Sequence, residues 1–338
     1  MGDGVRVTIL ASGSKGNATL FESGGTSLLV DAGISVSEVA ARAPRLDAVV
    51  VTHAHGDHTG NFRQLAKRLR STVYMTEATA RAKGVTEVVK RYGSREPFAV
   101  GPFTVSPLPL PHDAAQVGLV VSDGVHRVGL ATDLGEVPPG LVGHLRGCDA
   151  LLLESNHDIG RLLGGPYPPS LKQRIASARG HLSNDQLGEL LRAHYRDAAT
   201  SGLTAARTVV LMHLSEQNNR PEIALGQARD ALADRCDRLL VASQHEPLDV
   251  PLGPALGQLR LFAPGLAHVG LTPAPLPRPW RGERDDGVET ERSLRFPLLP
   301  LSTSVERGPG GEASVDDRLA AKNKVDMRPR RGLERGTR

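Results

Sequence analysis

Short apolar runs separated by Gly-rich turns open the chain and predict three strands, at residues 5–10, 18–22 and 26–31. Because the turns between these runs are short, we expect an antiparallel meander. A helix follows, which begins at Ser35 or Ser37, both good N-cap residues, and ends before Pro44.

The continuous β-branched run at 47–52 predicts a buried strand that ends directly at His53, and an amphipathic helix is expected at 61–70. Further strands are expected at 103–108, 117–122, 127–132, 150–154, 207–212 and 238–242, and further helices at 170–178, 184–197 and 222–234. This order predicts an α/β (α+β) fold in which two mixed β-sheets are flanked by helices, an αββα sandwich, rather than a strictly alternating doubly wound sheet.

The composition changes after about Pro247 and divides the chain. We expect a catalytic domain at 1–250 and a Pro/Gly/Arg-rich C-terminal extension at 251–338, mostly disordered from about 273. The extension is either a solvated appendage or a weak nucleic-acid tether. The net charge of the whole chain is +4. This charge suits a polyanionic partner and also an ordinary soluble surface, so it does not decide whether the chain binds nucleic acid.

Composition also bears on the compartment. Hydrophobic residues make up 39% of the chain and aromatic residues 3%, so the core is expected to be aliphatic. Cys148 and Cys236 are isolated and predict neither disulfides nor a Cys-x-x-Cys metal site. No apolar run reaches the ~18 residues of a membrane span, and the N-terminus lacks a signal-peptide pattern. We therefore expect a cytoplasmic protein without a membrane partner.

Candidate chemistry is concentrated in the segment from His53 to His58, directly after the predicted buried strand. In an extended loop, residues two apart project to the same side, so His53 and His55 can bind one ion. The next turn aims Asp57 and His58 at a second ion. Zinc and manganese both accept imidazole and carboxylate ligands, and two such ions ~3.5–4 Å apart share a hydroxide. The alternative is a histidine-rich surface loop.

The segment 52–58 resembles the T-H-x-H-x-D-H signature of the metallo-β-lactamase superfamily. The resemblance implies that His112 completes the first metal site, that Asp133 bridges both ions, and that His213 is the last ligand of the second site. Each of these three residues follows a predicted strand. Without the signature, each reads equally as a hydrogen-bonded structural residue.

The segments 10–17, 154–158, 180–184 and 213–219 are similar to the WalJ/YycJ branch of that superfamily, and the resemblance covers about residues 5–245. It implies a cytoplasmic bacterial nuclease with 5′-to-3′ exonuclease activity on DNA. A β-CASP nuclease needs an inserted domain that does not fit between Asp133 and His213. RNase Z needs a substrate arm that does not fit between His112 and Asp133. A true β-lactamase is normally exported and often has Cys at the bridging position. This sequence has Asp133 there and lacks a signal-peptide pattern, so β-lactamase activity is not expected.

For phosphodiester hydrolysis, the metal pair activates water and neutralises charge, and Asp57 is expected to orient the hydroxide. His181 is the expected proton donor to the leaving oxygen, and the alternative is a structural histidine beside a helix. We assign substrate binding to the turn residues Ser12, Ser14, Lys15 and Asn17. The alternative for this segment is an ordinary hairpin turn.

His157 is predicted either to contact substrate or, with Glu154, to orient metal ligands. Arg174 either adds to a phosphate-binding surface or belongs to a solvated helix face.

Two other functions share the metal signature. A thioester or lactone hydrolase resembling glyoxalase II would have a narrow, uncharged pocket and no salt-sensitive affinity for nucleic acid. A regulatory module with structural metals would have closed four-coordinate sites. Zinc or manganese, DNA or RNA, and the oligomeric state are left open by the sequence.

Overall fold

The computed structural model of the chain describes residues 4–85, 89–233 and 235–253. The chain splits into one unit at Met1–Gly265 and a second at Leu266–Arg338. Most of the predicted C-terminal extension at 251–338, including the part predicted to be disordered, lies outside the described residues, so both expectations stay predictions. None of the helices in the described part of the chain is long and apolar enough to cross a membrane.

The first sheet combines the N-terminal strands with the last described one. Its order is β14 (Leu248–Val250), β1 (Arg6–Ala11), β2 (Ala18–Ser23), β3 (Thr26–Val30), β4 (Ala48–Val51), β5 (Thr72–Met75) and β6 (Lys90–Arg91). Pairing is antiparallel from β14 to β3, and the predicted meander is confirmed. From β3 to β6 it is parallel.

The second sheet has the order β13 (Arg238–Val241), β12 (Thr208–Met212), β11 (Ala150–Glu154), β10 (Arg127–Ala131), β9 (Gln116–Ser122), β8 (Phe103–Leu110) and β7 (Phe98–Val100). Pairing is antiparallel from β7 to β10 and parallel from β10 to β13. Every residue of β11 and β12 is buried, as expected for parallel strands covered on both faces.

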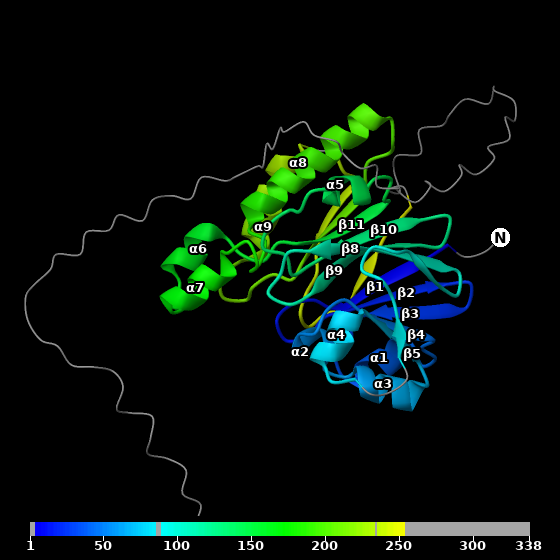
Figure 1. Ribbon diagram of the computed structural model, residues 1–338. Coiled ribbons are helices and arrows are strands. Elements are labelled where there is room, and N and C mark those ends of the chain that lie inside the picture. Colours follow the sequence, from blue (N-terminus) through cyan, green and yellow to red (C-terminus); the bar gives the residue numbers. More distant parts are fainter. Residues whose placement is uncertain (1–3, 86–88, 234, 254–338) are drawn as a thin grey trace, which may run out of the picture. The chain divides into compact units, whose positions relative to one another are not determined.

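Helices cover both outer faces (Figure 1). They are α1 (Val36–Arg42), α2 (Gly56–Thr59), α3 (Phe62–Leu69), α4 (Glu77–Ala82), α5 (Leu141–His144), α6 (Ile159–Gly164), α7 (Pro169–Ile175), α8 (Asn184–Ser201) and α9 (Pro221–Leu232). Apolar residues of α1, α3 and α4 pack on the first sheet, and those of α5, α8 and α9 on the second. A third apolar layer fills the space between the sheets. The predicted αββα sandwich is confirmed.

Helix starts follow the expected capping chemistry. Ser35, rather than Ser37, caps α1 and forms a capping box with Glu38. Ser183 and Gln186 form the same arrangement at the start of α8. By contrast, α6 and α7 lie beside the sandwich rather than on a sheet face (Figure 1).

The ends of the parallel strands position the polar residues. His53 follows β4, Asp133 follows β10, and His213 follows β12 closely. Three residues at strand ends have left-handed backbone conformations: Asp31 (φ 64°), Asp133 (φ 58°) and His213 (φ 53°). Such conformations are uncommon outside glycine and often mark functional sites.

Candidate metal centre

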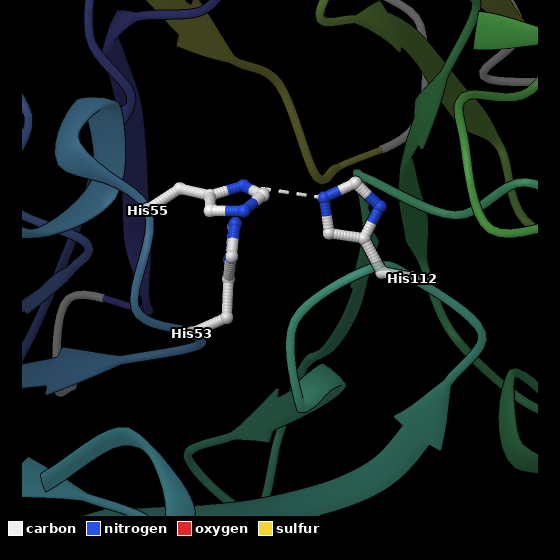
Figure 2. Close-up of side chains that lie close together, drawn as sticks. All are labelled: His53, His55 and His112. Carbon is white, nitrogen blue, oxygen red and sulfur yellow. Dashed lines mark hydrogen bonds between the residues drawn. The ribbon is translucent and has the colours of Figure 1, made fainter. Parts of the chain in front are cut away.

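His53, His55 and His112 form the first of three clusters whose ligand atoms lie within 4.8 Å of one another. Figure 2 shows His53 and His55 on one loop and His112 facing them from the other sheet. Nε2 of His112 lies 3.3 Å from Nδ1 of His55. Two loops far apart in sequence therefore bring three imidazoles to one point, as the sequence predicts.

Hydrogen bonds fix the rings of two of these histidines. Nδ1 of His112 lies 3.0 Å from the carbonyl oxygen of Gly180, which can only accept, so Nδ1 carries the proton and Nε2 is left for an ion. Thr52 Oγ1 donates to the Asp31 carboxylate and lies 3.1 Å from His53 Nδ1. Nδ1 of His53 thus donates to the hydroxyl, and Nε2 faces the cluster.

A second group lies beside the first and contains Asp133, Glu154, His181 and His213. Asp133 Oδ1 is 3.1 Å from His213 Nδ1, and Asp133 Oδ2 is 3.2 Å from His58 Nε2. His53, His58 and Asp133 form a third cluster, which overlaps both others. Because the two oxygens of Asp133 face different histidines, its carboxylate has the geometry of a bridge between two positions.

Asp31, at the end of β3, organises this side of the centre, and the sequence analysis missed it. Its Oδ1 accepts from the backbone and side chain of Thr52, at 2.9 and 3.0 Å, and its Oδ2 lies 2.7 Å from His58 Nδ1. The carboxylate fixes His58 so that Nε2 points at Asp133. The available signal was an Asp directly after an apolar strand, as at Asp133.

Glu154 plays a similar part on the other side. Its Oε1 lies 2.8 Å from His181 Nδ1 and 3.3 Å from His213 Nδ1, and its Oε2 accepts from the backbone of Leu134 at 2.9 Å. Glu154 is fully buried, so its carboxylate is shielded from solvent and orients the rings of both histidines. This agrees with the predicted orienting role and also places the carboxylate among the candidate ligands.

Burial and neighbouring charges shift the pKa values of the residues in the centre in opposite directions. Burial, followed by the nearby charge of His58, lowers the pKa of His53 to about 2. Burial also opposes charge on His213, but Asp133 and Glu154 outweigh it and raise the pKa of His213 to about 10. Likewise, burial is outweighed at Glu154, where His181 and His213 lower the pKa to about 2.

The residues present fit divalent metal ions. Three buried atoms that face the centre have no hydrogen-bond partner in the described part of the chain: His53 Nε2, Asp133 Oδ2 and His213 Nδ1. Buried polar atoms are rarely left unpaired, and a missing ion is one of the few explanations. Imidazole nitrogens combined with carboxylate oxygens are a donor set that zinc and manganese both accept.

Asp57 belongs to none of the three clusters found among the described residues. Its Oδ2 lies 3.5 Å from His58 Nε2 and accepts from Asn17 Nδ2 at 3.3 Å. Asn17 is buried and also bonds to Gly13, and buried Ser12 accepts from the backbone N–H of His213 at 2.8 Å. The turn that carries Ser12 and Asn17 therefore holds Asp57 and His213 in place through hydrogen bonds. This favours a structural turn over substrate binding for both residues.

The other predicted substrate-binding residues are placed differently from one another. Ser14 and Lys15 are exposed, and Lys15 forms a 2.8 Å ion pair with Glu216. Ser14 lines a small cavity together with His112 and His181. His157 is 1% exposed, and burial lowers its pKa to about 4. This burial favours an orienting role for His157 over direct contact with substrate.

Asp113 is a further residue that the sequence analysis missed. Its Oδ1 lies 3.1 Å from His55 Nε2 and 3.3 Å from His112 Nε2. Its Oδ2 accepts from Nε of Arg174 at 3.0 Å and from a second nitrogen of the same guanidinium. Arg174, on α7, is therefore ion-paired beside the centre, but its side chain is also 61% exposed, so both expectations for this residue stay predictions.

Two mixed sheets between helix layers, with histidine and carboxylate clusters at the strand ends, define the metallo-β-lactamase class of fold and site. The family described as "Beta-lactamase superfamily domain" matches residues 26–214. "Exodeoxyribonuclease WalJ" of Streptococcus pneumoniae (strain D39) is 32% identical over 238 residues, which are 65% of this chain and 86% of the relative. "Exodeoxyribonuclease YycJ" of Bacillus anthracis is 29% identical over 248 residues, 69% of this chain and 90% of the relative. The chain therefore belongs to the metallo-β-lactamase superfamily and, within it, to the WalJ/YycJ branch.

Solved structures agree on the fold. The metallo-β-lactamase fold protein YhfI from Bacillus subtilis superposes with a TM-score of 0.59 at 21% identity, covering 73% of this chain and all of that one. A diphosphatase of the PhnP family superposes with a TM-score of 0.53 at 18% identity, covering 74% of this chain and 98% of that one. The family and fold predicted from the sequence are confirmed.

Proposed function

We propose that the chain is a metal-dependent exonuclease that hydrolyses DNA from the 5′ end with two divalent ions, manganese or zinc. The observation that carries the proposal is the alignment with 86% of an exodeoxyribonuclease. The site supports it, because Asp133 faces His58 through one oxygen and His213 through the other. RNA is the second candidate substrate, beside DNA.

His53, His55 and His112 would hold one ion, and His58, Asp133 and His213 the other, with Asp133 between them. When bound, such a pair supplies a water of lowered pKa and polarises the phosphoryl oxygens. Asp57, half-buried beside His58, orients the attacking water.

His181 gives the proton to the leaving oxygen. Its side chain is 24% exposed, and its Nδ1 faces Glu154, so Nε2 is left for the substrate. Burial lowers the pKa of His181, but the Glu154 carboxylate outweighs burial and raises it. A raised pKa favours the protonated ring, which is the form that a general acid requires.

The proposal is tested by a time course with 5′-labelled and 3′-labelled DNA and RNA. Metal-stripped protein is refilled with manganese or zinc, and His55→Ala is compared with His126→Ala, which changes a histidine of the β9–β10 turn outside the clusters. We expect mononucleotide release from the 5′ end, lost in His55→Ala and kept in His126→Ala. Release from the 3′ end would overturn the polarity. Hydrolysis of thioesters or lactones with no cleavage of nucleic acid would overturn the nuclease assignment.

A further inference from the structure

A cavity of about 170 Å³ lies next to the metal centre, and the proposed chemistry does not use most of its wall. His112 and His181 form the side that faces the centre. Tyr167, Arg174, Ser14 and Ser215 also line it. The cavity therefore shares two of its lining residues with the candidate metal centre.

Tyr167 and Arg174 form a wall of the cavity that belongs to the segment carrying α6 and α7. This segment follows β11 and precedes α8 in sequence, and it lies beside the sandwich (Figure 1). Arg174 of α7 donates two hydrogen bonds to Asp113, whose other oxygen contacts His55 and His112. Charge-assisted pairs with two donors from one guanidinium impose a specific geometry. This pair ties α7 directly to the loop that carries a candidate metal ligand.

Tyr167 supplies an aromatic surface in this wall. The chain has four tyrosines, and Tyr74, Tyr92 and Tyr195 are buried in the core, whereas Tyr167 is partly exposed. Proline precedes and follows Tyr167, which restricts the backbone and lowers the entropic cost of holding the ring. Aromatic rings beside a nucleic-acid site are platforms on which bases stack.

Asp113 neutralises the arginine of the lining by pairing with the guanidinium of Arg174, and the hydroxyls of Ser14 and Ser215 line the same cavity. Such a lining fits a base and a sugar better than an additional phosphate. At about 170 Å³ the cavity is smaller than the roughly 300–1,000 Å³ of common ligand pockets. His112 also lines a larger cavity of about 520 Å³, which leaves room for a continuing strand.

We propose that the small cavity is the end-binding subsite of the enzyme: it holds the terminal nucleoside of the DNA strand, with the base stacked on Tyr167, and the Arg174–Asp113 pair holds α7 as a wall that stops the strand. This inference rests on the proposed function. It predicts that cleavage removes one nucleotide at a time, since no chain would extend past the wall.

The first test measures binding to the metal-loaded full-length chain by calorimetry. The probes are thymidine 3′-monophosphate, whose phosphate stands for the scissile group, and inorganic phosphate alone. We expect Tyr167→Ala to weaken the nucleotide by about tenfold, as lost stacking predicts, and to leave inorganic phosphate unchanged. Tyr167→Phe should bind like the wild type, and so should Leu163→Ala, which changes an exposed residue of α6. Equal nucleotide binding by Tyr167→Ala and wild type would overturn the stacking role.

The second test asks where cleavage occurs. The wild type should release mononucleotides from linear DNA and leave circular single-stranded DNA intact. Arg174→Ala should release longer products and cut the circle, because the wall is no longer held. A wild type that cuts circles as fast as linear strands would overturn the end-binding subsite and leave the nuclease intact. A wild type that cuts no DNA would overturn the proposed function, while nucleoside binding that depends on Tyr167 would still support the subsite.

Discussion

In the first sheet, antiparallel pairing from β14 to β3 changes to parallel pairing from β3 onward, and in the second sheet the same change occurs at β10. β3 and β10 therefore occupy equivalent places in the two sheets. Each is followed by an aspartate with a left-handed backbone, Asp31 at φ 64° after β3 and, two residues beyond β10, Asp133 at φ 58°. The two halves share a topology and a local conformation at this point.

The two aspartates use this position differently. Asp31 is satisfied within its own half, by Thr52 and by His58. Asp133 Oδ2 has no hydrogen-bond partner among the described residues and faces His58 of the other half. Since an unpaired buried carboxylate oxygen is costly, we infer from the difference that Asp133 is kept for a ligand and that Asp31 builds the site.

The largest expected effect comes from exchanging these carboxylates for amides. Asp133→Asn should lower kcat by about 10³-fold, because it removes the charge that the proposed metal pair would share and with it several kcal/mol of transition-state stabilisation. Asp31→Asn should instead weaken metal affinity by about 10–100-fold, as is usual for residues that orient ligands. Steady-state DNA hydrolysis across a metal titration measures both.

The two variants are separated by rescue with excess metal. Saturating manganese or zinc should restore most of the activity of Asp31→Asn and little of that of Asp133→Asn. Circular dichroism spectra like that of the wild type would exclude global unfolding as the cause. Equal rescue of both variants would mean that the two positions do the same work and that the comparison fails.

A histidine of each half can be compared by its pKa, and the difference predicts a smaller effect, on how stability depends on pH. The pKa of His53 is lowered to about 2, whereas the pKa of His213 is raised to about 10. In metal-free protein, the proton on His213 stabilises the fold fully below its unfolded pKa of ~6.5, and this stabilisation is lost as the pH rises through about 10. The unfolding temperature of metal-free protein should therefore fall between pH 7 and pH 10.

His213→Asn should flatten this pH dependence, and differential scanning calorimetry across the range measures it. His53 is neutral throughout the same range, so His53→Asn should leave the slope between pH 7 and pH 10 close to that of the wild type. A slope that His213→Asn leaves unchanged would assign the pH dependence to other groups.

The first half was easier to predict from sequence than the second, for a physical reason. His53, His55 and His58 are close in sequence, so a local pattern reveals them. His112, Asp133 and His213 follow separate strands, and they were found only because the resemblance supplied their places. Of the strands before them, β12 is a continuous apolar run that the sequence reveals, whereas β8 alternates between buried and more exposed residues.

Features that depend on distant contacts were missed. Asp31 acts through residues 21 and 27 positions away, and Asp113 acts through a residue 61 positions away. The strands β5 and β6 were also missed. β5 has only four residues, and β6 consists of two charged residues, so neither shows a recognisable hydrophobic pattern. Their conformation is set by pairing with β4 and with each other.

The smallest effect compares the helix starts of the two halves. Ser35 of α1 and Ser183 of α8 make the same reciprocal capping box, but Ser35 is partly exposed and Ser183 is 3% exposed. Water can replace the lost cap at Ser35, so Ser35→Ala should cost about 0.5 kcal/mol, whereas Ser183→Ala should cost about 1–2 kcal/mol because it leaves a shielded N–H unpaired. Urea unfolding measures both, with Ser170→Ala, on the exposed first turn of α7, as the matched control. A larger cost at Ser35 than at Ser183 would show that burial does not set the strength of these caps.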